Sequence, residues 1–352
     1  MKYRFIAIFA GAAFALQLAS ASDERSGPPA TAQMVTGGLH LYDEVLPVRS
    51  PDGRWLAFEY SEMSDPNFPR IGIMDLTAAS HPWRPLLRPK HGRHLFVGDL
   101  SWSPDSQWLA VLTDYPEGIE SLLSDTQNQV VKVDIHSGEA IKLTSFPPNT
   151  IVGPTTAWLR SGLIVFPAMD DGIYAVSANG GTMRKLISVP KNKCGGGTNT
   201  LAVTPDELSI AFTMDSSSDG QIEECNALWI GDLRTGTLRR LPTPDLHPLS
   251  PFWLDGNTIL FSGEYAKDDR PLGLYSVSLE SGKVATLLEG TYLSPFVCDS
   301  GKTLYFSWGP KLAHKTPPGE DWSTSNPFYG FHIWKVPLHD VLGRVAGPSR
   351  GE

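Results

Sequence analysis

Beyond its first 21 residues, the sequence lacks any apolar run of the about 18 to 20 residues that a membrane-spanning helix requires. The first 21 residues have the order of a secretory signal peptide. Lys2 and Arg4 precede an apolar stretch at 5–18, and Ala19-Ser20-Ala21 forms a small-residue cleavage site. We therefore expect residues 1–21 to be removed, the mature chain to have no transmembrane segment, and the protein to be periplasmic or secreted.

Basic charge is also scarce, with 29 Lys and Arg residues against 38 Asp and Glu residues and a formal net charge of −9. Because nucleic-acid binding needs a basic surface, this balance argues against nucleic acid as a partner. The sequence also lacks a Gly-x-Ser-x-Gly elbow, a phosphate-binding glycine loop, a His-Glu-x-x-His pair and a Cys-x-x-Cys pair. These absences favour a non-catalytic protein.

What the chain does contain is a repeat. Residues 48–60 read Val-Arg-Ser-Pro-Asp-Gly-Arg-Trp-Leu-Ala-Phe-Glu-Tyr, in which Ser-Pro-Asp-Gly is a tight-turn sequence and the apolar residues after it suit a β-strand. Five variants follow. The last apolar residues of the six copies are spaced by 53, 55, 46, 49 and 45 residues, and they are Phe58, Val111, Phe166, Phe212, Phe261 and Phe306.

A second signature recurs inside each copy, a strand that ends in a polar turn, such as Val-Lys-Val-Asp-Ile-His-Ser-Gly at 131–138. A fourth strand follows most of these turns. Four strands at a period of roughly 40 to 55 residues are typical of a β-propeller blade, and blades must stack around an axis because one sheet cannot bury both of its faces. We predict an all-β fold, a six-bladed β-propeller of four-stranded antiparallel blades spanning residues 39–348.

The Ser-Pro-Asp-Gly-Arg-Trp-Leu-Ala-Phe core at 50–58, followed by a strand that ends in Asp75-Leu76, resembles the WD40-like PD40 repeat of the TolB-type six-bladed propellers. The resemblance covers roughly residues 40–345. The protein that gives these propellers their name has an α/β domain before its repeats. Only about 20 residues separate the signal peptide from the first blade here, so we expect this chain to lack that domain. Propellers of this kind serve many unrelated functions.

Residues 22–38 are polar and contain Gly27-Pro28-Pro29. They form either an extended tail or a closing strand, which would complete the ring as the outer strand of blade six. The sequence leaves both arrangements open.

Three cysteines in an exported protein allow one disulfide. Cys194 precedes the first strand of blade four and Cys225 lies near the start of its third strand, in loops that a propeller places on the same face. We therefore expect a Cys194–Cys225 disulfide. Cys298 lies within a strand, where we expect a buried thiol.

The entry ends of the first strands of the six blades are expected to line the central channel. The polar residues there form a mixed set suited to hydrogen-bonding a ligand, and the candidate ligand-binding residues are Glu44, Asp99, Thr155, Asn199, His247 and Ser294. The Pro-Asp turns lie at the other face, so we expect Asp52, Asp105 and Asp206 to have structural roles.

One loop resembles the start of a calcium-binding loop. The sequence 215–222, Asp-Ser-Ser-Ser-Asp-Gly-Gln-Ile, places oxygen-bearing side chains at alternate positions with a glycine for the turn, and the candidate metal ligands are Asp215, Ser217 and Asp219. Position twelve of the motif is Asn226 rather than a glutamate. Calcium is the only cofactor that the sequence suggests, and an acidic hairpin without metal is the alternative.

The loops between second and third strands contain 17 acidic and five basic residues, at approximately 61–70, 114–129, 167–172, 214–226, 263–272 and 307–331. Such a face would attract a basic partner. Our first hypothesis is a monomeric, exported, non-catalytic scaffold that binds an envelope protein or peptide. The alternative is a carbohydrate-active enzyme, a lyase or hydrolase with an oligosaccharide substrate at the channel mouth and His247 and Asp99 as acid-base candidates.

Overall fold

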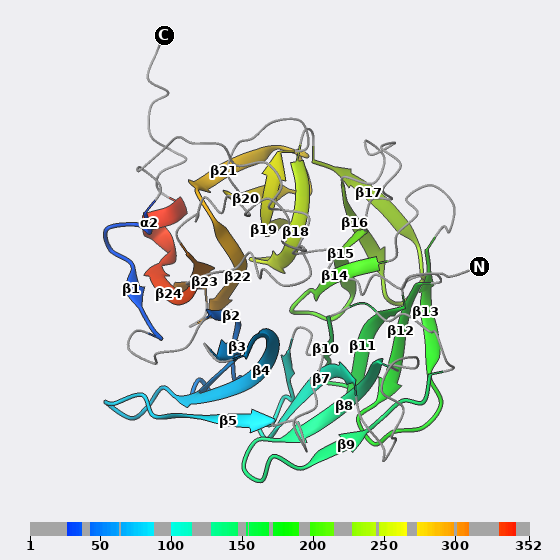
Figure 1. Ribbon diagram of the computed structural model, residues 1–352. Coiled ribbons are helices and arrows are strands. Elements are labelled where there is room, and N and C mark those ends of the chain that lie inside the picture. The colour runs from blue at the N-terminus through cyan, green and yellow to red at the C-terminus, as the bar shows by residue number, and fades with distance from the viewer. Residues whose placement is uncertain are drawn as a thin grey trace, which may run out of the picture.

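Six four-stranded antiparallel sheets are arranged as blades around a central axis in the computed structural model (Figure 1). The predicted fold class, an all-β six-bladed propeller, is confirmed. The structure describes residues 27–36, 43–62, 65–87, 100–114, 128–146, 153, 155–168, 172–189, 198–214, 227–243, 246–265, 273–298, 301–309 and 331–342.

Blades one to five are meanders of strands that pair in sequence order from the centre outwards, with the first strands nearest the axis (Figure 1). Blades one to three consist of β2 (Asp43–Arg49), β3 (Trp55–Glu62), β4 (Asp65–Asp75) and β5 (Trp83–Leu87); β6 (Ser101–Trp102), β7 (Trp108–Asp114), β8 (Asn128–Asp134) and β9 (Ala140–Lys142); and β10 (Ala157–Trp158), β11 (Leu163–Ala168), β12 (Gly172–Ser177) and β13 (Arg184–Ser188). Blades four and five consist of β14 (Thr198–Val203), β15 (Ser209–Met214), β16 (Ala227–Asp232) and β17 (Leu238–Pro242); and β18 (Leu246–Trp253), β19 (Thr258–Tyr265), β20 (Gly273–Ser278) and β21 (Val284–Glu289).

Blade six combines the two ends of the propeller. Its strands are β22 (Tyr292–Cys298), β23 (Thr303–Trp308), β24 (His332–Pro337) and, at the outer edge, β1 (Gln33–Met34). A five-residue helix, α2 (Leu338–Leu342), follows β24. Residues 22–38 therefore contribute a closing strand, which is the second of the two arrangements left open by the sequence. Ring closure of this kind ties the N-terminal segment to the last blade.

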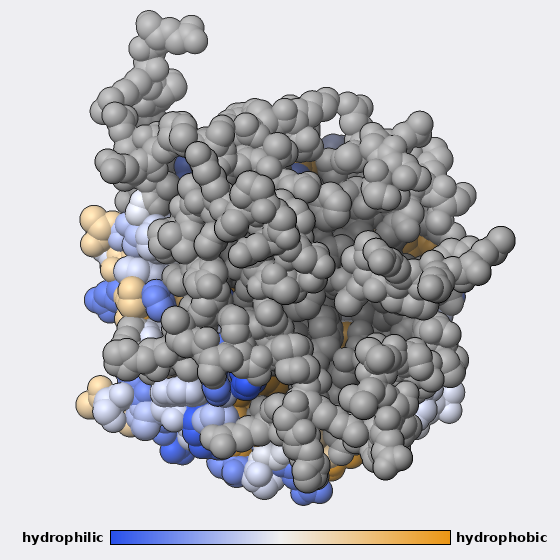
Figure 2. Space-filling model, viewed as in Figure 1, coloured by the Kyte–Doolittle hydropathy of each residue, from blue (hydrophilic) through white to orange (hydrophobic). Residues whose placement is uncertain are grey.

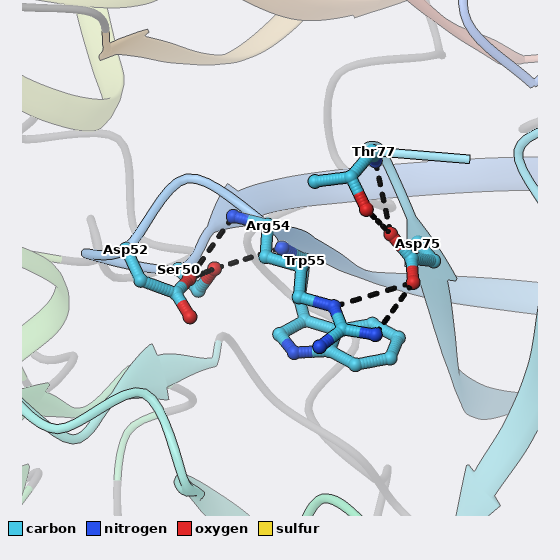
Figure 3. Close-up of polar contacts among 6 residues, drawn as sticks. All are labelled: Ser50, Asp52, Arg54, Trp55, Asp75 and Thr77. Atoms are coloured by element: carbon cyan, nitrogen blue, oxygen red, sulfur yellow. Dashed lines mark hydrogen bonds and ion pairs between the residues drawn. The ribbon is translucent and has the colours of Figure 1, made fainter. Parts of the chain in front are cut away.

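The Pro-Asp turns are built as the repeat predicts, with their polar groups bonded inside the turn. Figure 3 shows the first of them, in which Asp52 Oδ1 accepts hydrogen bonds from Ser50 Oγ (2.5 Å) and from the backbone N–H of Arg54 (3.0 Å). Ser50 Oγ in turn accepts from the N–H of Trp55 at 2.8 Å. Gly53 has a φ of 76°, which the turn requires. The expected structural role of Asp52 is thus explained by its local bonds.

The core consists of six apolar layers, one between each pair of neighbouring blades, because each sheet buries both faces. The last apolar residue of every repeat is fully buried in one of these layers. Tryptophans add polar links between blades: Trp102 Nε1 donates to the carbonyl of Val48 and Trp253 Nε1 to that of Ala202, both at 3.0 Å. The blades therefore stabilise one another around the closed ring.

Apolar side chains are mostly confined to these layers. Among the described residues, the exposed large apolar side chains are Met34, Ile141 and Leu208. The part of the rim that Figure 2 colours is mixed, with hydrophilic residues prevailing. Cys298, expected to be buried, is half-buried in β22, where Arg49 Nη1 donates a hydrogen bond to its sulfur at 3.4 Å.

Candidate functional site at the ring seam

Antiparallel pairing places the start of the first strand and the start of the third strand at the same end of every blade. The connections between second and third strands leave from this end, which we call the loop face, and the Pro-Asp turns lie at the opposite end, which we call the turn face. The connecting segments at 115–127, 215–226 and 310–330 lie outside the described residues, so the gathering of acidic loops at one face stays a prediction.

The most developed polar cluster of the described residues lies at the loop face where blade six meets blade one. We call it the seam cluster, and it consists of Thr36, Asp43, Glu44, Phe331 and His332. Three separate segments supply it: the residues after β1, the start of β2 and the start of β24. The seam cluster is thus the point where the N-terminal strand, the first blade and the last blade meet.

Glu44 is the centre of this cluster. Its Oε2 lies 2.6 Å from His332 Nδ1 and accepts a hydrogen bond from Thr36 Oγ1 at 3.2 Å. Backbone bonds hold the carboxylate in place, since the N–H of Glu44 donates to the carbonyl of Phe331 (2.8 Å) and the N–H of Phe331 donates to Asp43 Oδ1 (3.1 Å). Thr36 Oγ1 also accepts from the N–H of Ile333 at 3.0 Å.

Glu44 and His332 differ sharply in burial. The Glu44 side chain has no exposed surface, whereas 32% of the His332 side chain is exposed. Glu44 Oε1 is buried and has no hydrogen-bond partner in the described structure. A buried carboxylate favours a charged neighbour, and the hydrogen bond from His332 to Glu44 raises the pKa of His332, against the opposing effect of burial and with a further contribution from Asp43.

This geometry orients the imidazole. With Nδ1 directed at a buried carboxylate, Nε2 is the ring nitrogen left to exchange a proton or donate a hydrogen bond at the loop face. An oriented histidine of this kind is the arrangement that general acid-base chemistry uses. The cluster also works as a structural tie, because the same bonds join three segments of the ring.

The other predicted ligand-binding residues do not join this cluster. Thr155 is buried just before β10, His247 is half-buried at the second position of β18, and Ser294 is half-buried in β22. Asp99 and the side chain of Asn199 lie outside the described residues, as do the predicted metal ligands Asp215, Ser217 and Asp219 and both predicted disulfide partners, Cys194 and Cys225. Their proposed roles stay predictions.

Strand register identifies a ring of equivalent positions near the axis. Counting two residues back from the first-strand partner of Ala57, Val165, Ala211, Leu260 and Tyr305 gives Leu46, Thr155, Thr200, Ser250 and Ser294. Four of these five side chains carry oxygen. Sequence reasoning identified Thr155 and Ser294 and missed Thr200 and Ser250, and the corresponding position of blade two lies outside the described residues.

Three of these positions carry a strained backbone. Leu46, Ser250 and Ser294 have φ values of 54°, 43° and 51°, each precedes a proline, and each lies at a register shift in its first strand. The bulge frees a backbone donor in blade five, where the N–H of Ser250 donates to Thr200 Oγ1 of blade four at 3.2 Å. The sequence carries a signal for two of these bulges, because Leu-Ser-Pro-Phe occurs at both 249–252 and 293–296.

The described residues contain no group of three or more His, Cys, Asp or Glu side chains placed to hold a metal ion. None of the helices in that part of the chain combines the length and the apolar character needed to span a bilayer. An open depression of about 420 Å³ lies between blades two and three, away from the seam, and is lined by Lys142, Leu143, Thr144, Ser145, Gly181, Thr182 and Met183.

No protein-family model and no curated protein sequence matches this chain. Solved structures share its fold. TolB from Acinetobacter baumannii is 16% identical, with a TM-score of 0.54 over 72% of this chain and 56% of that chain. An oligogalacturonate lyase from Vibrio parahaemolyticus is 15% identical, with a TM-score of 0.54 over 83% of this chain and 77% of that chain.

A third similar structure is the hydrazine synthase of Kuenenia stuttgartiensis, 16% identical with a TM-score of 0.55 over 89% of this chain and 83% of that chain. The matched region thus spans just over half of the Acinetobacter TolB chain. At these identities the comparisons show a shared propeller fold, and they include both a TolB protein and enzymes.

Proposed function

We propose that this protein is an exported, non-catalytic binding scaffold of the cell envelope, a TolB-like propeller of PD40 repeats that holds a protein or peptide with a basic surface. The observation that carries the proposal is the acidic composition of the sequence between second and third strands, which contains 17 acidic and five basic residues. We expect these sequences to form an acidic surface at the loop face. A periplasmic or secreted location follows from the signal sequence.

Three carboxylates of the turn face accept hydrogen bonds within their own turns. Asp75, Asp134 and Asp232 each accept backbone N–H bonds from their own turns, at 2.7 to 2.9 Å. Arg54 also pairs with Asp75 at 3.0 Å (Figure 3). Turn-face acids are thus committed to the fold, and the acidic loops supply the charge for steering a basic partner to the opposite face.

The test is affinity capture of envelope proteins followed by measurement of the affinity at several salt concentrations. Glu223→Gln with Glu224→Gln removes two charges from the loop face, and Glu139→Gln with Glu280→Gln removes two from the turn face as a matched control. We expect the loop-face variant to weaken binding by about tenfold and to reduce its salt dependence, with the control within about twofold of wild type. Equal effects of the two variants would contradict the proposal.

The acidic loop at 215–226 is proposed to bind calcium through Asp215, Ser217 and Asp219. Calcium at a hundredfold excess over its dissociation constant should then stabilise the protein by about 2.7 kcal/mol, as measured by thermal unfolding with calcium and with EDTA. We expect Asp215→Ala to abolish the shift and Asp125→Ala, in another acidic loop, to leave it unchanged. A calcium shift that persists in Asp215→Ala would rule out this site.

The alternative function, a carbohydrate-active lyase or hydrolase, is favoured by the Glu44–His332 pair. His332 Nε2 is the proton-transfer group that the geometry offers, with Glu44 as its positioning residue. The test is incubation with oligogalacturonate and neutral oligosaccharides and chromatography of the products. The scaffold proposal expects no product. Product formation that falls in His332→Gln but not in His136→Gln, a histidine of the turn face, would establish the enzyme instead.

A further inference from the structure

The seam cluster holds the ring closed through few bonds. The closing strand β1 pairs with β24 over two residues, Gln33 with Lys335 and Met34 with Trp334. The N–H of Val35 donates to the carbonyl of Ile333 at 2.7 Å, and beyond it Thr36 ties the strand to Glu44 and His332. Outer strands of the other blades pair over longer stretches, up to five residue pairs in β17. The hydrogen bond from Tyr292 Oη to the carbonyl of Gly27 (3.0 Å) and the packing of Ala32 and Val35 also hold this segment, and the seam cluster supplies its side-chain bonds to blade one.

We propose that the seam cluster is a proton-controlled latch, in which protonated His332 keeps the closing strand docked on blade six and loss of that proton releases it. The argument begins with Glu44, whose side chain is completely buried. An ionised carboxylate in such a place needs a compensating charge, and breaking a buried pair on one side leaves an uncompensated charge.

The charged groups that shift the pKa of His332 are both acidic, Glu44 and Asp43 of β2. The paired residues of β1 are uncharged, and the cross-strand partner in β23 is Trp308. Thr36 is the remaining side-chain donor to Glu44. A neutral His332 can still donate its Nδ1–H to Glu44, but it no longer offsets the charge of the buried carboxylate, whose other side-chain donor is the hydroxyl of Thr36.

The direction of the pH effect follows from the sign of the shift. The pKa of His332 is raised above its ordinary value of 6.5 by its hydrogen bond to Glu44, although burial opposes this. The stabilisation is therefore fully present below pH 6.5 and is lost as the pH rises through the raised pKa. The latch is closed below pH 6.5 and opens as the pH rises through the raised pKa of His332.

Hydrogen exchange of the full mature protein tests the latch. Protection factors, corrected for the intrinsic rate at each pH, are measured for a peptide covering residues 31–36 and for one covering β17 as an internal reference. We expect the protection of 31–36 to fall by about tenfold between pH 6 and pH 9 while that of β17 stays constant. A constant protection of 31–36 would overturn the proposal.

Two variants identify the titrating group. His332→Gln keeps a hydrogen-bonding side chain without the charge, so the protection of 31–36 should be low and independent of pH, whereas His136→Gln should behave as wild type. If His332→Gln does not fold, Thr36→Val separates the strand from the pair and should give low protection at both pH values. A wild-type pH response in either seam variant would contradict the latch.

Discussion

Phe261→Ala is expected to lower the free energy of unfolding by about 3–5 kcal/mol, because it removes a fully buried aromatic ring from a layer that two blades share. Phe261 has no exposed surface and stacks on Tyr275 with ring centroids 5.6 Å apart. The same layer contains Ala211 and Leu228 of blade four. Urea denaturation followed by circular dichroism provides the measurement.

The matched control is Leu208→Ala, which removes an apolar side chain that is 55% exposed at the turn face. Its expected effect is within about 0.5 kcal/mol. We also expect Phe261→Ala to unfold in one transition, since each blade is buried on both faces by neighbours in a closed ring. An early, separate unfolding transition of blades four and five would contradict the single transition. A loss of unfolding free energy no larger than that of Leu208→Ala would contradict the contribution assigned to Phe261.

The repeat was predictable because its signals are local. The turn hydrogen bonds of Ser50 and Asp52 all lie within five residues of sequence. The apolar run that follows the turn forms the second strand of the blade and is largely buried. Phe261 and its five equivalents occupy the same position in every blade, so their spacing alone indicates six units. Turn chemistry and periodicity thus determine both the blade and the number of blades.

Ring closure was not predictable in the same way. The closing strand has two residues, Gln33 and Met34, both exposed, and such a segment carries no alternation that distinguishes a strand from a tail. Its partner β24 lies some 300 residues away. Contacts between segments near the two ends of the chain decide between a closing strand and a tail. These contacts exist only in the assembled ring.

The candidate site was predictable in part for the same reason. Glu44 could be identified because the repeat places the start of each first strand near the axis. Its partner His332 is 288 residues away and belongs to no motif. Register explains the missed Thr200 and Ser250, since the bulges insert residues into the first strands and shift the equivalent positions.

Acid is expected to destabilise the propeller from its turn face, most steeply between about pH 4 and pH 2. Backbone N–H bonds from Ser137 and Thr235 lower the pKa values of Asp134 and Asp232, respectively, and the hydroxyl of Thr204 lowers that of Asp206. Bonds from the hydroxyl and the N–H of Thr77 lower the pKa of Asp75 to about 2. Asp75, Asp134 and Asp232 end third strands and Asp206 lies in a Pro-Asp turn, so both kinds of turn at this face lose stabilisation when these carboxylates are protonated.

The sign follows from the direction of these shifts. A carboxylate whose folded-state pKa lies below the ordinary 3.8 adds stability above pH 3.8 and loses it as the pH falls through the folded value. Asp206→Asn keeps an acceptor in the turn but removes one titrating group, so its unfolding free energy should change less between pH 4 and pH 2 than that of wild type. Urea denaturation at a series of pH values measures this slope.

Glu280→Gln is the control for this slope. Glu280 lies in a turn of the same face, where its backbone N–H donates to Asn257 Oδ1 at 3.0 Å. We expect its acid slope to match that of wild type. A wild-type slope in Asp206→Asn, or a rise of the unfolding free energy on acidification, would contradict a stabilising role of the turn carboxylates. Asp75 and Asp134 belong to blades one and two, and Asp206 and Asp232 to blade four. We expect their protonation to destabilise the ring as a whole, because neighbouring blades share their apolar layers.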